Sequence, residues 1–235
     1  MFFPIHDDNP LREIPRPYVT WGLLVLNCAI FLMQASPLGS HVAASFAIVP
    51  AELLRVGVIG GAAMGPYDVW PVPERYTLVS YMFLHGDIAH LIGNMAFLWV
   101  FGDNVEDELG HTRFAFFYIA CGIAGGLAHA VLLPGSTIPL IGASGAVAGV
   151  IVAYLIMFPH VRVWVLAMRV IPLRITALFA LGLWVASQFA MLAIPYVVPG
   201  AKIGPISWWA HIGGIAAGAV LVLTMRRKSR PSRTA

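Results

Sequence analysis

Four polar residues lie within apolar stretches of this chain, and together they carry the groups that acyl transfer requires. Ser144 lies in PLIGASGAVAGV and His211 lies in WWAHIGGIAAG. His90 and Asn94 are four residues apart in HGDIAHLIGNM, so a helix places both on one face. A serine hydroxyl becomes a nucleophile when a neighbouring base, such as an imidazole, removes its proton. We therefore predict that Ser144 is the nucleophile and that His211 is the general base.

The same segments supply donors for the oxyanion that forms when a serine attacks a carbonyl group. Asn94 and His90 carry side-chain donors, and the backbone N–H of Ser144 is free if a helix begins there. No Asp or Glu lies near His211, and the carboxylates of residues 103–108 fall at the opposite end of their segment. We therefore expect a Ser–His dyad without an acid. No H-E-x-x-H pair occurs, so we expect no metal ion and no cofactor.

The composition indicates that these residues are positioned by membrane-spanning helices. The 235 residues are 59% hydrophobic and only 11% charged, whereas about a quarter of a soluble domain is charged. Six charge-poor runs predict an all-α polytopic membrane protein with six transmembrane helices, because backbone groups in lipid must be paired within helices. The predicted spans are Val19–Ala35, Met82–Phe101, Phe114–Leu133, Ile141–Phe158, Ile175–Ile194 and Ile206–Met225.

The distribution of Lys and Arg predicts how the six spans are oriented. Eleven of the 14 basic residues lie on the side of the two termini, and the other three are Arg55, Arg75 and Lys202. Both termini are therefore expected to be cytoplasmic, in the plasma membrane if the source is bacterial. We divide the chain into a cytoplasmic segment (1–17), a membrane domain (18–226) and a basic tail (227–235). The tail is interpreted as an anchor at the inner leaflet, and no nucleic acid is expected to bind.

Helix geometry predicts that the reactive groups lie at one depth. Counted from the inner ends of their spans, Ser144, His211 and His90 lie roughly 17–21 Å above the cytoplasmic boundary, or about 10 Å below the outer surface. Their spans run in one direction, so the three groups can converge. Small residues beside Ser144 and His211, such as Gly145 and Gly214, permit close helix packing in lipid. His85 is five residues before His90 and is expected to point elsewhere.

Several motifs in this chain resemble those of the rhomboid intramembrane serine proteases. HGDIAHLIGNM, FGDNVEDELGHTRF, GASGAVAG and AHIGGIAAG occur in the family's order and spacing, over about residues 81–218. The resemblance implies a six-helix core that opens to the extracytoplasmic side. It implies Ser144 and His211 as the dyad, with His90, Asn94 and the Ser144 N–H around the oxyanion. Structural roles are implied for the remaining motif residues, which are His85, Glu106, Gly110, Gly142, Gly145 and Gly214.

The implied substrates are single-span membrane proteins in the lipid bilayer, cut in or near the outer end of the transmembrane helix. The sequence departs from the family at Ala148, where some members carry an aromatic residue beneath the catalytic histidine. It also lacks the Trp-Arg pair of the first loop and has Trp70 among prolines instead. From the family, the fifth span, with Phe179, Trp184 and Phe189, is the candidate element for substrate entry.

Other functions remain open at this stage. The main alternative is a catalytically silent, rhomboid-like binder or chaperone of transmembrane helices, which would use the same cleft without turnover. A Ser–Lys protease is disfavoured because Lys202, the only lysine on the outer side, lies in a loop. A transporter would show internal repeats or charged residues along a transmembrane path, and neither is present.

Overall fold

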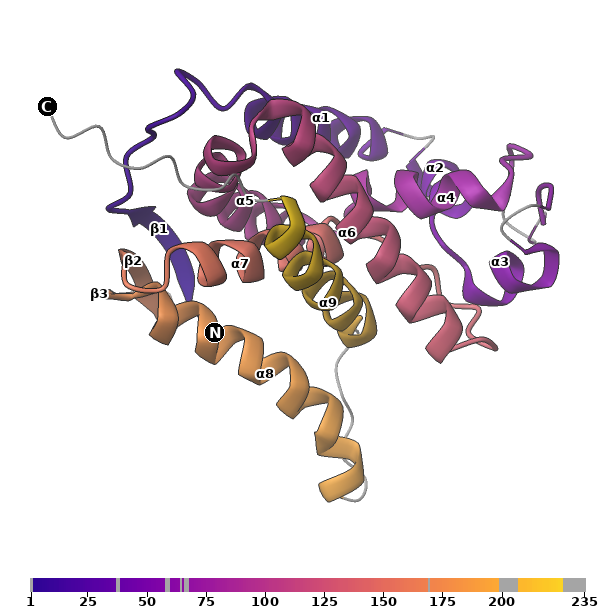
Figure 1. Ribbon diagram of the computed structural model, residues 1–235. Coiled ribbons are helices and arrows are strands. Elements are labelled where there is room, and N and C mark those ends of the chain that lie inside the picture. Colours follow the sequence, from indigo (N-terminus) through magenta and orange to yellow (C-terminus); the bar gives the residue numbers. More distant parts are fainter. Residues whose placement is uncertain are drawn as a thin grey trace, which may run out of the picture.

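The computed structural model describes residues 2–36, 39–57, 60–63, 65, 68–168, 170–198 and 207–225. The chain is mostly helical (Figure 1). Its helices are α1 (Tyr18–Gln34), α2 (Gly39–Phe46), α3 (Pro50–Val56), α4 (Glu74–Ser80), the 3-10 turn η1 (Tyr81–Phe83), α5 (Ile88–Leu109), α6 (His111–Leu132), α7 (Ser144–Met157), α8 (Ala177–Val197) and α9 (Trp208–Met225). Its strands are β1 (Phe3–Asp7), β2 (Arg162–Ala167) and β3 (Ile171–Thr176).

Each of the six predicted spans overlaps a helix, and among the described residues three helices are long and apolar enough to cross a membrane. These are α6, α8 and α9, while α1 and α7 are apolar but shorter. The second predicted span needs the largest correction, because α5 begins at Ile88 rather than Met82. The Asp87 carboxylate accepts a hydrogen bond from the His90 N–H at 2.8 Å and caps the helix there. The helix then continues past Asp103 to Leu109.

A three-stranded antiparallel sheet, in the order β1-β2-β3, corrects the prediction of an all-α chain. Strands β2 and β3 form a hairpin between α7 and α8, and β1 comes from the N-terminal segment (Figure 1). The segment RVWVLA alternates, with Val163 and Val165 buried and Trp164 exposed. Such alternation is typical of a strand with one buried face. The sequence interpretation had assigned this region to a loop because it lies between two apolar spans.

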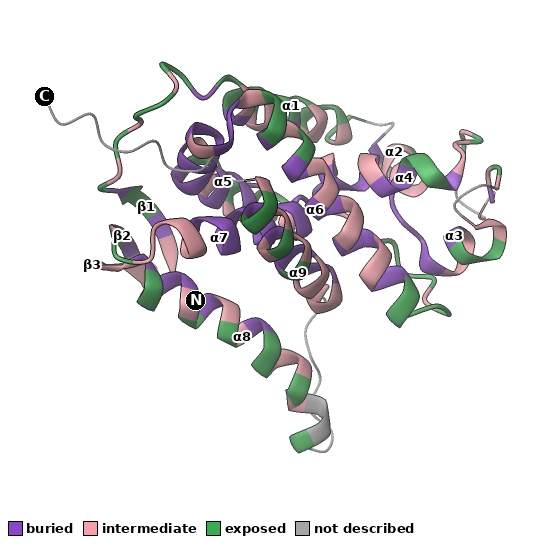
Figure 2. Ribbon diagram, viewed as in Figure 1, coloured by how far each residue is buried: buried purple, intermediate pink, exposed green. Residues whose placement is uncertain are grey.

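Helix α7 lies at the centre of the fold and is buried along most of its length (Figure 2). Helices α6, α7 and α9 pack against one another at glycines that leave no room for a side chain. A Cβ on Gly125 would lie 2.6 Å from the Ala210 carbonyl oxygen, and one on Gly218 would lie 2.6 Å from the Cα of Gly149. These contacts bring the three backbones close together, and the contact between α7 and α9 is the one that the small residues beside Ser144 and His211 predicted.

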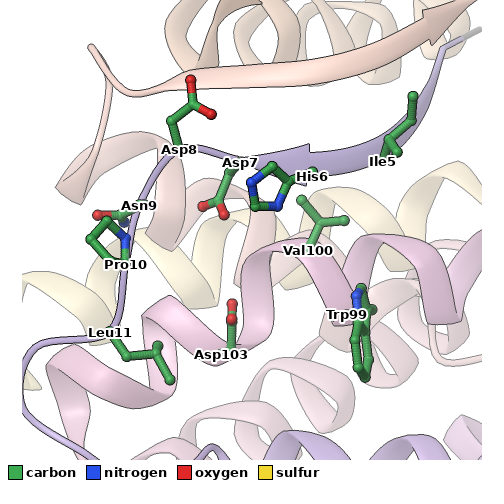
Figure 3. A pocket seen from close by; sticks show the side chains of 10 residues that line it. All are labelled: Ile5, His6, Asp7, Asp8, Asn9, Pro10, Leu11, Trp99, Val100 and Asp103. Atoms are coloured by element: carbon green, nitrogen blue, oxygen red, sulfur yellow. The ribbon is translucent and has the colours of Figure 1, made fainter.

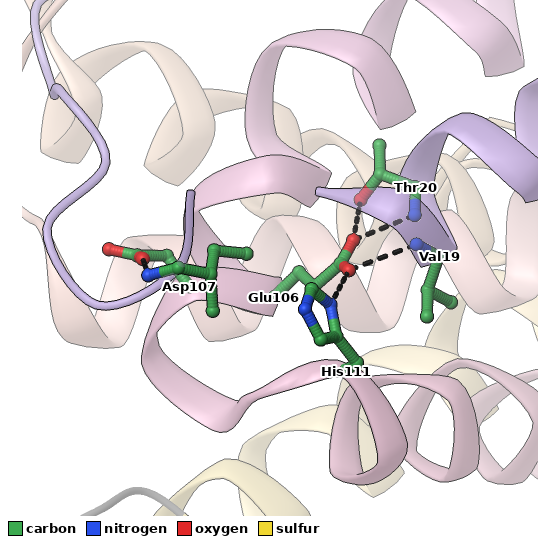
Figure 4. Close-up of polar contacts among 6 residues, drawn as sticks. Val19, Thr20, Glu106, Asp107 and His111 are labelled. Atoms are coloured by element: carbon green, nitrogen blue, oxygen red, sulfur yellow. Dashed lines mark hydrogen bonds and ion pairs between the residues drawn. The ribbon is translucent and has the colours of Figure 1, made fainter. Parts of the chain in front are cut away.

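Two carboxylates at the C-terminal end of α5 bind the N-terminal segment. Glu106, with 0% exposure, accepts hydrogen bonds from the N–H groups of Val19 and Thr20, the Thr20 hydroxyl and the His111 ring (Figure 4). Asp107 accepts three more, from the backbone N–H groups of residues 12–14. Gly110 joins α5 to α6 with a φ of 79°, which favours glycine. The start of α1 is thereby fixed to the end of α5.

Several of the Lys and Arg residues on which the predicted orientation of the spans depends lie outside the described residues. These are Arg169, Lys202 and the basic residues of the tail, Arg226, Arg227, Lys228, Arg230 and Arg233.

Candidate active site

Ser144 is the first residue of α7, and a fixed turn precedes it. The turn is held by a backbone bridge between Ile48 and Leu140 and by the Gly142 N–H, which donates to the Tyr81 carbonyl oxygen at 2.9 Å. Gly142 has a φ of 121°, a backbone conformation that favours glycine. As the first helical residue, Ser144 has a backbone N–H without a carbonyl partner in its own helix. Its side chain is half-buried.

His90 and Asn94 of α5 lie against this turn. A Cβ on Gly142 would be 2.7 Å from the His90 Nε2 and 3.8 Å from the Asn94 Nδ2. The structure therefore brings the predicted donor face of α5 beside the residues that precede Ser144. Asn94 is buried and His90 is half-buried, so a group bound at the turn could reach both side chains.

His85 joins this cluster, so the prediction that it points elsewhere is wrong. Its Nε2 lies 3.0 Å from the Asn94 Nδ2, and its ring centroid lies 5.1 Å from that of His90. The prediction assumed one continuous helix, but α5 begins at Ile88 and His85 lies in the preceding segment. There its backbone N–H donates to the Gln34 side-chain oxygen at 3.0 Å. Because an amide nitrogen only donates, Nε2 of His85 accepts from Asn94.

His211 lies near the start of α9, beside the start of α7. A Cβ on Gly145 would be 3.3 Å from the Ala210 carbonyl oxygen, and one on Gly214 would overlap the Gly145 carbonyl. The residues next to Ser144 and next to His211 are therefore in direct backbone contact. His211 itself is 8% exposed. Within the described part of the chain, the Ser144 hydroxyl makes no side-chain hydrogen bond, to His211 or to another group.

The His211 ring has partners that the sequence interpretation missed. Its Nδ1 lies 2.7 Å from Oε1 of Gln188 on α8. The indole rings of Trp184 and Trp208 lie with their centroids 5.9 Å from the imidazole centroid. These contacts support the ring from α8 and α9, whereas Ala148 on α7 carries only a methyl group. The signal was available, because a glutamine in an apolar span is a functional candidate by default.

A second group of polar residues lies at the other end of α5, around a cavity of about 450 Å³ between β1 and α5 (Figure 3). Burial raises the pKa of the Asp7 carboxyl to about 6, against the opposing hydrogen bond from the Tyr154 hydroxyl. Burial, followed by the charge of Asp7, raises the pKa of Asp103 to about 7. Asp103 is thirteen residues after His90 on the same helix, which places it about 20 Å from the His90 end. These carboxyls therefore belong to a separate region.

Among the described residues, no three His, Cys, Asp or Glu side chains gather as metal ligands would. His211 likewise has no hydrogen bond to a carboxylate in this part of the chain, and its Nδ1 partner is an amide oxygen.

The fold and site together define an integral membrane protein with serine, histidine and amide groups gathered at one end of a helical bundle. Residues 72–228 match the family model described as the rhomboid domain. This match covers more than half of the chain, and the protein belongs to the rhomboid family.

Individual relatives agree with this assignment. The chain is 29% identical over 158 residues to RHOMBOID-like protein 6, mitochondrial, of Arabidopsis thaliana, covering 66% of this chain and 46% of that protein. It is 42% identical over 82 residues to Rhomboid protease GluP of Bacillus subtilis, covering 35% and 16%. It is 27% identical over 221 residues to human Rhomboid-related protein 3, covering 91% and 49%. The chain spans less than half the length of each of these relatives.

Proposed function

We propose that this protein is an intramembrane serine endopeptidase that uses Ser144 and His211 as a catalytic dyad. The observation that carries the proposal is the backbone contact between the start of α7 and the start of α9, at Gly145, Ala210 and Gly214. The family match supports the same reaction class, because one relative is named as a rhomboid protease. The pairing needs no metal ion and no cofactor.

In the proposed reaction, Oγ of Ser144 attacks the scissile carbonyl carbon while His211 accepts the hydroxyl proton. The oxyanion accepts hydrogen bonds from Asn94, His90 and the Ser144 N–H. The C–N bond then breaks, and His211 gives its proton to the leaving amine. Water, with His211 again as the base, hydrolyses the acyl-enzyme and regenerates Ser144. Loss of one oxyanion donor typically lowers kcat by about 10²–10³.

The proposed arrangement in the membrane has six transmembrane helices, both termini in the cytoplasm and the dyad near the extracytoplasmic side. The substrates are single-span membrane proteins cut in their transmembrane segments, near that side. A substrate helix must unwind locally, because a helical carbonyl is already hydrogen-bonded. Substrates with helix-weakening residues near the cleavage site should therefore be cut faster.

The test uses the purified protein in lipid vesicles with a single-span model substrate. We expect the wild-type protein to cut the substrate and to react with a fluorophosphonate at Ser144. Ser144→Ala should abolish both reactions, and His211→Ala should abolish labelling. Ser136→Ala, a change to a half-buried serine in the loop before α7, is the matched control and should behave as wild type.

Two outcomes would contradict the proposal. Cleavage that persists in Ser144→Ala would show that another residue is the nucleophile. A wild-type protein that captures the substrate helix, but neither cuts it nor reacts with the probe, would instead indicate a catalytically silent binder.

A further inference from the structure

Gln188 is a buried polar residue on a mostly apolar helix, and the dyad mechanism does not use it. It is 3% exposed on α8. Its Oε1 lies 2.7 Å from Nδ1 of His211, and its Nε2 donates at 2.9 Å to the Trp184 carbonyl oxygen. The same Nε2 lies 2.9 Å from the Ser187 hydroxyl oxygen. A buried polar group with all its partners in place has a fixed orientation.

The partners of this amide determine which way it points. The Trp184 carbonyl oxygen can only accept, so the NH₂ group of Gln188 must face it. Oε1 is therefore turned toward His211, and because Oε1 can also only accept, Nδ1 of His211 must carry a proton. A neutral imidazole holds one proton, so Nε2 is left with a free lone pair.

We propose that Gln188 is a positioning residue that holds His211 in the Nδ1–H tautomer, leaving Nε2 to accept the Ser144 proton. This inference rests on the proposed function. A ring with its proton on Nε2 could not act as the base toward Ser144 through that nitrogen. In serine proteases with a third catalytic residue, a carboxylate holds the histidine in the same way. Here a neutral amide on α8 has that role.

The packing around the ring supports this role. Trp184 lies one turn before Gln188 on α8, and its ring centroid is 5.9 Å from that of His211. Helix α8 thus supplies both an aromatic contact, tilted by 35°, and a hydrogen bond to the imidazole. The competence of the base therefore depends on α8 being in place.

The test compares two substitutions at one position. Gln188→Leu removes the acceptor and keeps a similar volume, and Gln188→Glu keeps an oxygen acceptor. In vesicles, we expect Gln188→Leu to lower kcat by about 10²-fold, a loss typical of a misoriented catalytic group. KM should change little, because Gln188 is buried and its polar atoms are bonded within the protein. Gln188→Glu should restore most of kcat.

The second readout is the ¹⁵N NMR spectrum of histidine-labelled protein, with the His211 signals assigned by their loss in His211→Asn. Nδ1 should carry the proton in the wild-type protein and in Gln188→Glu, and the proton should move toward Nε2 in Gln188→Leu. Leu183→Ala, a change at an exposed position on the same helix, is the control and should leave kcat and the spectrum unchanged. Thermal unfolding of each variant verifies that it is folded.

The outcomes separate this inference from the proposed function. If wild-type protein is active and Gln188→Leu retains its kcat and its tautomer, the positioning role is wrong. If Gln188→Leu loses activity while Nδ1 keeps its proton and Gln188→Glu gives no rescue, Gln188 is only structural. If the wild-type protein neither cuts nor reacts at Ser144, the proposed function fails, and the tautomer signal still reports whether Gln188 orients the ring.

Discussion

The two ends of α5 hold polar groups in opposite ways. At the C-terminal end, Glu106 accepts four hydrogen bonds and Asp107 accepts three, all from distant parts of the chain or the next helix. At the N-terminal end, His90 lies beside Gly142, in the turn that precedes Ser144, and the Ser144 hydroxyl makes no side-chain hydrogen bond within the described residues. The first end uses its polar groups to join helices, and the second keeps donors and acceptors free for another molecule.

The comparison also shows which chemistry each end can perform. The Glu106 carboxylate, with all four of its lone pairs occupied, is not available as a base, whereas an imidazole with one free nitrogen is. The first end should therefore govern stability, and the second should govern turnover. Three variants test this separation.

The largest expected effect on stability is at Glu106. Glu106→Ala would leave the buried N–H groups of Val19 and Thr20 without partners, so we expect the free energy of unfolding to fall by about 3–5 kcal/mol. The measurement is denaturant unfolding in detergent micelles. Glu108→Ala, which changes a half-buried carboxylate in the same turn, is the control and should lose less than about 1 kcal/mol. Equal losses in the two variants would contradict the role of Glu106 as the junction.

A smaller effect is expected at Gly214, which packs against Gly145 beside the proposed active site. Gly214→Ala places a methyl group on the Gly145 carbonyl oxygen, so α7 and α9 must separate. We expect a loss of about 1–3 kcal/mol in stability and a fall in Ser144 labelling that exceeds the unfolded fraction. Gly22→Ala is the matched control, because nothing lies within 4 Å of its added Cβ. If folded Gly214→Ala is labelled at the wild-type rate, the close contact between α7 and α9 is not needed for the reactivity of Ser144.

The smallest expected effect is on the pH dependence of the free energy of unfolding, and Asp103 is the residue that tests it. Because the folded-state pKa values of Asp7 and Asp103 are raised, to about 6 and about 7, their protonated forms favour the folded state. Their contribution to stability is fully present below about pH 4, which is the pKa of an aspartate in the unfolded chain. It is lost as the pH rises through 6 and 7. Asp103→Asn should therefore flatten the fall in unfolding free energy between pH 5 and pH 8.

The measurement for this prediction is denaturant unfolding at both pH values, and Glu13→Gln, at an exposed carboxyl, is the control. An unchanged slope in Asp103→Asn would show that Asp7 and Asp103 do not set the pH dependence of stability.

The sequence predicted the apolar helices well because lipid imposes one simple requirement, that backbone groups pair within the segment. The predicted spans Val19–Ala35 and Phe114–Leu133 differ from α1 and α6 by at most three residues at either end. The sheet was missed because the partner of β1 lies more than 150 residues away, and pairing at that distance leaves no local signal.

Those features of the site that depend on local helix geometry were also predicted, whereas those that depend on contacts between distant segments were not. Helix periodicity correctly placed His90 and Asn94 on one face, and the small residues predicted close contact between α7 and α9. His85 was misplaced because a helix period was applied before the helix begins at Ile88. Gln188 could have been noticed as a polar residue in an apolar span, but its contact with His211 could not be predicted, because no spacing rule relates a residue on α8 to one on α9. The contact depends on how the two helices lie in space.

The bonds of Glu106 also set an order of events during synthesis. Thr20 and Glu106 are 86 residues apart in the chain, so the first turn of α1 has no partner for its N–H groups until the whole of α5 has left the ribosome. Strand β1 waits longer still, until Arg162–Ala167 has been made. The segment that is translated first is thus among the last to reach its final position. A chain that ends before residue 106 lacks the carboxylate that binds the first turn of α1.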